Sequence, residues 1–133
     1  MKVYCASKSK YWPWWTALRA AGIPITATWV DWDFNKDTGR EPSHDSWQAH
    51  WIACIEQARD ADIVLAFCGA EESQNGALLE VGAALGAGKM VYLVTEHNWS
   101  WRHHPKVRLF ATLEAATTAI LAWHESERAR HEH

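Results

Sequence analysis

The chain has 133 residues, enough for one domain with a hydrophobic core and too few for two. Its 13 Lys and Arg against 16 Asp and Glu residues give a net charge of −3, and no basic stripe runs among the aromatic residues, which argues against binding of a nucleic acid polymer. No apolar run reaches the roughly 18 residues of a membrane span and no signal peptide pattern opens the chain, so we expect a cytoplasmic protein that does not bind membranes.

The cysteines and histidines do not form a metal-binding pattern. Cys5, Cys54 and Cys68 lie in apolar segments at spacings that match no zinc motif, and their odd number argues against a disulfide framework. The eight histidines are scattered and form no helical ligand pair. We therefore expect buried cysteines, no metal and no other cofactor.

Strand and helix patterns alternate from the N-terminus. Residues 2–6 predict a first strand, and the next helix has Pro13 in its first turn and Gly22 past its end. Residues 25–30 are rich in β-branched side chains and predict a second strand. Residues 31–44 contain Asp, Asn, Gly, Pro and Ser without periodicity, which predicts a long surface loop.

The second half of the chain continues the alternation. Asp45 and Gln48 form a candidate capping box for a helix that runs to about residue 59. Residues 62–67 are continuously apolar, as in a buried parallel strand. The chain then continues with a helix that ends at Gly88, strands over residues 90–94 and 107–110, a helix over residues 113–123 and a polar tail that frays.

This order of elements predicts a single-domain α/β fold. We expect a flavodoxin-like (Rossmann-like) three-layer sandwich, with helices on both faces of a parallel five-stranded sheet of order 2-1-3-4-5. The domain would cover residues 1–124, and residues 125–133 would form the tail. Ligands of such sheets bind beyond the carboxyl ends of the strands, here between strands 1 and 3. The candidate site therefore draws on residues 7–10, 31–33 and 68–80.

Glu80 is the carboxylate of an otherwise nearly uncharged helix. No Lys or Arg can pair with it along its face, because its neighbours three and four residues away are Gly76, Ala77, Ala83 and Ala84. It is either an ordinary glutamate near a helix N-terminus or an acid presented for chemistry, and its place at the predicted crevice favours the second interpretation. Small residues after it would let the helix approach the sheet closely, namely Gly82, Ala83 and Gly86.

The ten tryptophans are the exceptional feature of the composition. Trp47 and Trp51 stand four residues apart, which is the period of a helix packed on a sheet, and are predicted to be structural. Four others fall in predicted turns, where they either pack or stack on a flat ligand such as a nucleobase: Trp12, Trp32, Trp99 and Trp101.

Several segments in combination resemble the nucleoside 2-deoxyribosyltransferase-like superfamily, which includes nucleoside 5′-monophosphate N-glycosidases. They are residues 3–7, 58–66, 76–84 with 88–91, and 105–110 with the terminal helix. The resemblance spans about residues 2–122 and is poor over residues 23–50. Its most specific part is the glycine four residues before Glu80 and the glycine two residues after it.

The resemblance implies that Glu80 is a nucleophile that attacks the anomeric carbon of a 2-deoxyribosyl group. A buried carboxylate suits this reaction, because breaking an N-glycosidic bond develops positive charge on the sugar. The implied enzyme is a nucleoside deoxyribosyltransferase or a deoxynucleoside 5′-monophosphate N-glycosidase of nucleotide salvage. Transferases of the family commonly carry an aspartate at the position of Gln74, and an amide cannot act as a general acid, so the expectation moves toward hydrolysis.

Other residues are candidates for substrate binding. Ser7, Lys8 and Ser9, with Lys10, either bind a 5′-phosphate or form a solvated turn. Asp31 and Asp33 either accept hydrogen bonds from the sugar or base or are exposed loop acids.

The segment before Glu80 and a later loop add further candidates. Gly69, Asn75 and Gly76 fall in the selected crevice, where Asn75 either binds sugar hydroxyls or caps the helix. The resemblance implies that a polar residue near Asn98 completes the pocket of a neighbouring subunit, in which case the protein is a homo-oligomer, a dimer or larger.

Two other classes of function remain open. One is a NAD-cleaving or nucleotide-sensing domain, as in TIR-like proteins, which also use a glutamate against an N-riboside. The other is a nucleotide-binding module without activity. Cleavage of NAD but not of deoxynucleosides would favour the first, and binding without turnover would favour the second.

Overall fold

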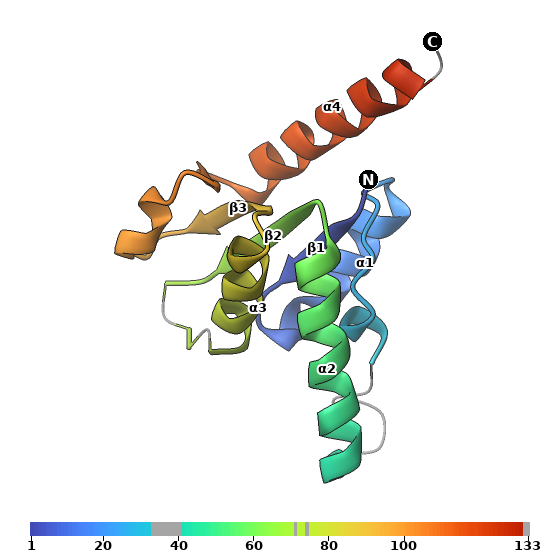
Figure 1. The fold of residues 1–133 in the computed structure, drawn as a ribbon, viewed down its shortest axis with the longest axis vertical. Coiled ribbons are helices and arrows are strands. Elements are labelled where there is room, and N and C mark those ends of the chain that lie inside the picture. Colours follow the sequence, from blue (N-terminus) through green and yellow to red (C-terminus); the bar gives the residue numbers. More distant parts are fainter. Residues whose placement is uncertain (33–40, 71, 74, 132–133) are drawn as a thin grey trace.

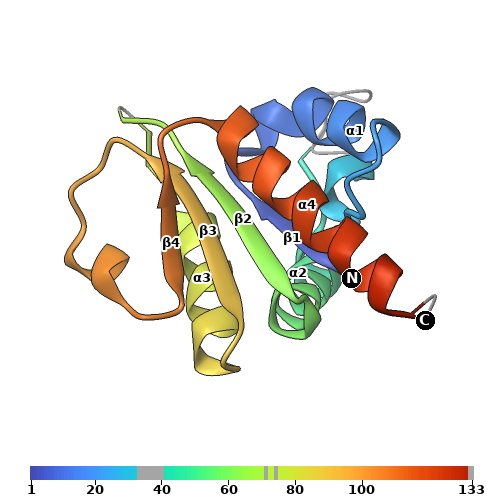
Figure 2. The ribbon, with the colours of Figure 1, turned by 90° about the horizontal axis from the view of Figure 1, so that it is seen from above.

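The computed structural model describes residues 1–32, 41–70, 72–73 and 75–131, and shows an α/β fold in three layers (Figures 1 and 2). The described strands form a parallel sheet of order β1-β2-β3-β4, made of β1 (Val3–Ala6), β2 (Ile63–Cys68), β3 (Met90–Thr95) and β4 (Val107–Phe110). The helices are α1 (Trp12–Ala20), α2 (His44–Asp60), α3 (Asn75–Gly86) and α4 (Leu113–His131), with short 3-10 turns η1 (Ser9–Tyr11), η2 (Trp29–Asp31) and η3 (Ser100–His103). Figure 2 shows α1 and α4 on one face of the sheet and α2 and α3 on the other. The predicted α/β architecture is confirmed.

The prediction of a second strand over residues 25–30 is wrong, so the sheet has four described strands instead of five. Ile25 makes a single parallel bridge to Val3, and the chain then turns into η2. The Trp29 indole N–H donates to the Cys5 carbonyl at 2.8 Å, so at this position of β1 a side chain takes the place of a strand partner. Without that strand, the order of the other four is the one expected.

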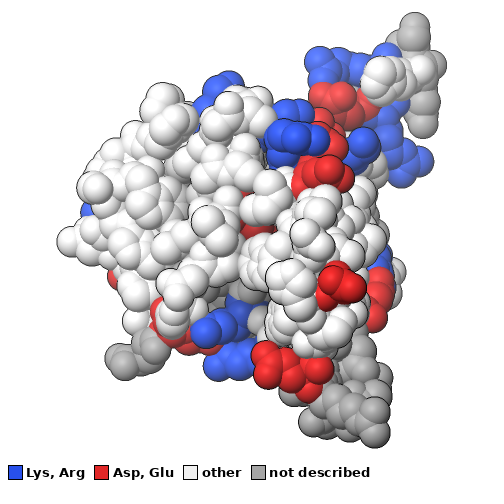
Figure 3. Space-filling view, turned by 60° about the horizontal axis from the view of Figure 1, so that its bottom comes forward, with Lys and Arg blue, Asp and Glu red and all other residues white. Residues whose placement is uncertain are grey.

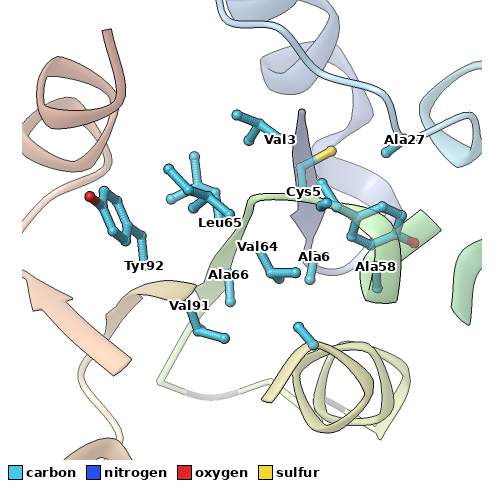
Figure 4. Close-up of a cluster of buried hydrophobic side chains, with 14 of the residues drawn as sticks. Val3, Cys5, Ala6, Ala27, Ala58, Val64, Leu65, Ala66, Val91 and Tyr92 are labelled. Carbon is cyan, nitrogen blue, oxygen red and sulfur yellow. The ribbon is translucent and has the colours of Figure 1, made fainter. Parts of the chain in front are cut away.

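Both faces of β1 and β2 are buried, which explains their continuous apolar sequences. All four residues of β1 are inaccessible to solvent, and β2 has one half-buried position, Phe67. Figure 4 shows the alternation: Val64, Ala66 and Val91 point toward α3, and Leu65 points to the opposite face. The same alternation in β1 directs Tyr4 toward the layer that contains α3.

The helix termini follow local sequence signals, with one exception. Pro13 lies in the first turn of α1, and Gly22 follows its end with φ of +111°, a conformation that favours glycine. The N-cap of α2 is Ser43, whose hydroxyl accepts the Ser46 N–H at 3.1 Å. The predicted capping box that starts at Asp45 is therefore wrong, because that residue already lies inside the helix.

The last helix is longer than the sequence predicted. α4 continues through the polar segment to His131 instead of ending near residue 123, and Figure 1 shows it extending past the sheet. Glu127 explains part of this, because its carboxylate accepts the Trp123 indole N–H at 3.1 Å, four residues before it, and pairs with Arg130, three residues after it. None of the helices in the described ranges is both long and apolar enough to cross a membrane.

Candidate active site

A cavity of about 300 Å³ opens beyond the carboxyl ends of β1 and β2. Ser7, Lys8 and Ser9 follow β1 and form one side, here called the β1 rim, and Ser73, Asn75 and Gly76 form another, the α3 rim. Glu80 and a group of aromatic residues line the rest. Figure 3 turns the lower side of Figure 1 forward and shows a largely uncharged surface, with Lys and Arg side chains beside Asp and Glu near its lower edge. The cavity lies at the strand ends where ligands of such sheets bind.

Glu80 is a buried carboxylate on the cavity wall. Its residue is 5% exposed, and within the described ranges it has no ion-pair partner. Burial raises the pKa of Glu80 well above its ordinary value of 4.5. The hydroxyl of Tyr4, which is fully buried in β1, donates a hydrogen bond to Glu80 Oε2 and favours the ionised carboxylate. The site thus holds an acid whose charge is costly and whose orientation is fixed.

The glycines of α3 have different roles from those the sequence suggested. A Cβ on Gly76 would lie 2.8 Å from the ring of Trp51, so this glycine lets the indole rest on the helix one turn before Glu80. A Cβ on Gly82 or Gly86 would have no atom within 4 Å, so neither brings the helix closer to the sheet. The close approach is between α2 and α3.

Aromatic residues of η2 and α2 line a further part of the cavity, here called the aromatic wall. Trp29, Trp47 and Trp51 line the cavity together with His50, and all four are buried or half-buried. The spacing of Trp47 and Trp51 predicted packing residues, since a helix that faces a cavity has the same period as one that faces a core. Trp29 and Tyr4 were not predicted as site residues, because both fall in segments that the sequence predicted to be strands.

His50 and Cys54 lie one turn apart on α2 at this wall. The His50 Nε2 and Cys54 Sγ atoms are 3.5 Å apart, and the His50 ring stacks on Trp32 with a centroid distance of 4.0 Å. Burial lowers the pKa of His50 and raises that of Cys54 to about 12, so both are neutral at pH 7. A thiol with this pKa is not a nucleophile. No group of three or more His, Cys, Asp or Glu side chains gathers as metal ligands in the described part of the chain.

The β1 rim is fixed by its own hydrogen bonds. The Ser7 hydroxyl accepts the Trp15 indole N–H at 2.8 Å and donates to the Lys8 carbonyl at 2.9 Å. Lys8 and Ser9 also line the cavity. Lys10, which the sequence grouped with them, is not among the lining residues, and its ammonium group lies 3.0 Å from the carboxylate of Glu72. Lys8 is therefore the ammonium group that the β1 rim brings to the cavity.

Other predicted site residues are placed outside this cavity. Asp31 accepts two hydrogen bonds from Arg19, both 2.9 Å long, and lines a neighbouring depression. Gly69 lines a separate cavity of about 280 Å³, and its carbonyl lies 2.9 Å from His97 Nε2. Asn98 is exposed in the segment after β3. The remaining two, Asp33 and Gln74, lie outside the described residues, whereas Asn75 and Gly76 belong to the α3 rim.

Comparison with solved structures finds a similar fold. The CMP N-glycosidase BcmB from Clostridium botulinum matches with a TM-score of 0.55 over 92% of this chain and 99% of its own, at 16% sequence identity. The chain has the fold of this N-glycosidase. The resemblance to the nucleoside 2-deoxyribosyltransferase-like superfamily is thereby confirmed at the level of the fold. No family model and no curated protein matches the sequence.

Proposed function

We propose that the protein cleaves the N-glycosidic bond of a 2′-deoxyribonucleoside or its 5′-monophosphate, with Glu80 as the nucleophile. The observation that carries the proposal is a buried carboxylate on the wall of a cavity at the carboxyl ends of the strands, held by the Tyr4 hydroxyl. The similarity of the fold to that of a CMP N-glycosidase supports this class of reaction.

The first step would transfer the sugar to Glu80. A carboxylate oxygen attacks the anomeric carbon, the carbon–nitrogen bond breaks, and its electron pair leaves with the base, which takes up a proton. The Tyr4 hydroxyl donates to Oε2, and we assign the attack to Oε1. The negative carboxylate also stabilises the positive charge that develops on the sugar, and it does so strongly in a site shielded from water.

The second step would release the sugar from the ester formed with Glu80. Attack by water gives the free sugar or sugar phosphate, and attack by the nitrogen of a second base gives a new nucleoside. Water is the favoured acceptor, because Gln74 cannot supply the proton that an aspartate would handle in a transferase.

The shape of the cavity supports a mononucleotide as the substrate. Its volume of about 300 Å³ suits one base and one sugar phosphate better than a dinucleotide such as NAD. Trp29, Trp47 and Trp51 offer rings for a base to stack on, and Lys8 on the β1 rim offers an ammonium group for a 5′-phosphate. Glu80 lines the same cavity as these groups, as cleavage of the bond between base and sugar requires.

Chromatography of the released base tests the proposal. Wild-type protein and the Glu80→Gln variant are incubated with deoxynucleosides, their 5′-monophosphates, CMP and NAD, each with and without a second free base. We expect base release from a monophosphate or nucleoside by the wild type alone, and no new nucleoside from the second base. Release from NAD alone would favour the NAD-cleaving alternative. A folded wild type that binds a nucleotide and cleaves nothing would overturn the proposal in favour of a binding module.

A further inference from the structure

The carboxylate of Glu72 links two segments far apart in the sequence. Its Oε1 accepts the Tyr11 hydroxyl at 2.8 Å, and its Oε2 lies 3.0 Å from the Lys10 ammonium group. The Glu72 side chain is 13% exposed, although it belongs to the loop between β2 and α3. We call these three residues, Lys10, Tyr11 and Glu72, the Glu72 bridge.

The Glu72 bridge connects the two rims of the cavity. Lys10 and Tyr11 lie in η1, directly after the β1 rim, and Glu72 directly precedes Ser73 of the α3 rim. None of the three bridge residues lines the cavity itself. The bridge therefore touches the site only through the rims that it joins.

Both ends of the bridge are anchored in the fold. The Tyr11 ring packs on Trp14 at a centroid distance of 4.4 Å and on Phe67 of β2 at 5.1 Å. The Glu72 N–H donates to the Gly69 carbonyl at 3.3 Å. A Cβ on Gly69 would lie 2.1 Å from Glu72 Oε1, so glycine at this position lets the carboxylate reach Tyr11. Loss of the bridge would thus remove the direct link between the two rims.

We infer that the Glu72 bridge sets the spacing between the two rims and thereby holds Lys8 where it meets the 5′-phosphate of the substrate. This inference rests on the proposed function. The three residues of the Glu72 bridge are positioning residues, because they act on the substrate through Lys8 and the rims. The bridge makes the enzyme selective for nucleoside monophosphates over nucleosides, since only the monophosphate uses the group that the bridge positions.

The two contacts of the bridge differ in strength. The Lys10 side chain is 64% exposed, and an ion pair this accessible to solvent is weak. The hydrogen bond from Tyr11 to the partly buried carboxylate is charge-assisted and stronger. Burial raises the pKa of Glu72, but the contacts with Lys10 and Tyr11 lower it by more. The pKa of Glu72 is therefore below its ordinary value, and the carboxylate is ionised at neutral pH. Tyr11 should therefore contribute more than Lys10.

Steady-state kinetics on a 5′-monophosphate and its nucleoside test the inference, starting with CMP and dCMP and their nucleosides. We expect Tyr11→Phe to raise KM for the monophosphate roughly five- to tenfold, with kcat within about twofold and with KM for the nucleoside nearly unchanged. Glu72→Ala should have a larger effect. Glu72→Gln should restore part of the loss, because its amide oxygen still accepts the Tyr11 hydroxyl, and Lys10→Met should have the smallest effect.

A matched control separates positioning from stability. Tyr92→Phe removes a hydroxyl from a buried tyrosine on β3 that packs on Phe110, away from both rims, and should leave both KM values unchanged. Equal losses on monophosphate and nucleoside, or a loss confined to kcat, would overturn the inference. Unchanged kinetics in both Tyr11→Phe and Glu72→Ala would do so as well.

Failure of the proposed function gives a different result. If the wild type cleaves no substrate, the same ligand pairs are compared by isothermal titration calorimetry. Selective weakening of monophosphate binding by Tyr11→Phe would still support the bridge, and equal binding by wild type and variant would overturn it. Absence of any binding to the wild type would overturn both the proposed function and the inference.

Discussion

The cavity has two differently built sides, the wall at Glu80 and the β1 rim. At the wall, one carboxylate is 5% exposed and has a neutral donor, Tyr4, as its partner. At the rim, hydroxyl and ammonium groups lie close to solvent, and the neighbouring Lys10 is neutralised by Glu72. A buried charge has a high desolvation free energy and interacts strongly with a ligand, whereas the interactions of an exposed charge are screened by solvent and salt. We therefore assign bond cleavage to the wall and substrate selection to the rim.

The largest expected effect is at the wall. Glu80→Ala and Glu80→Gln should each lower kcat by roughly a thousandfold or more, because both remove the nucleophile. Glu80→Gln keeps the shape of the side chain and controls for packing. Turnover is measured as released base, and folding by circular dichroism. Activity of Glu80→Gln close to that of the wild type would remove the distinction between wall and rim.

Tyr4→Phe should have the next largest effect. The change removes the hydroxyl that donates to Glu80 Oε2, so the pKa of Glu80 should rise further and less of the nucleophile should be ionised at neutral pH. We expect kcat/KM at pH 7 to fall about tenfold to a hundredfold, and the rising limb of the pH–rate profile to move to higher pH. A loss of activity that is equal at every pH would contradict this account of Tyr4.

A rim substitution should alter selection more than chemistry. Lys8→Ala should raise KM for a 5′-monophosphate about tenfold and leave kcat and the nucleoside KM nearly unchanged, because it removes a charged phosphate contact. Lys106→Ala is the matched control, since this exposed lysine precedes β4 at the other end of the strands. Equal losses on monophosphate and nucleoside would show that the rim does not read the phosphate.

The smallest expected effect is on stability. The pKa of Glu80 in the folded state lies above the ordinary value of 4.5. At a pH between the ordinary pKa and the folded-state pKa, the folded protein holds a proton that the unfolded chain has released. The free energy of unfolding of the wild type therefore falls as the pH rises through this window. Glu80→Gln cannot titrate and should raise Tm by about 4 °C at neutral pH, with less difference near pH 4. Thermal denaturation between pH 4 and 8 measures this, and a gain that does not depend on pH would contradict it.

The sequence predicted the position of Glu80 better than the pairing of charges at the β1 rim or the place of the aromatic residues. The strands around Glu80 are buried on both faces and read as continuous apolar runs, and glycines mark the helix ends, so the position of α3 followed from local signals. Residues 25–30 have strand propensity, but it is the indole N–H of Trp29, and not a backbone N–H, that donates to the Cys5 carbonyl of β1. Strand propensity carries no information about whether a side chain will replace a backbone donor.

Long-range pairing explains what the sequence could not show at the rim. Lys8 and Lys10 look equivalent as neighbours in a short polar segment, and only the fold shows that Lys10 forms an ion pair with Glu72 at 3.0 Å. Asp31 likewise looked available to a ligand, whereas the fold places Arg19 against it. Charge patterns in sequence identify the ionisable groups, and the tertiary structure decides which of them are neutralised.

The indoles on the cavity wall have a practical consequence. Three of the ten tryptophans, Trp29, Trp47 and Trp51, lie where a ligand would sit, and the other seven do not line this cavity. Indole emission responds to a stacked base, so occupancy of the cavity should quench part of the intrinsic fluorescence of the protein. The chain carries its own optical reporter of ligand entry, and it needs neither a label nor turnover to be read.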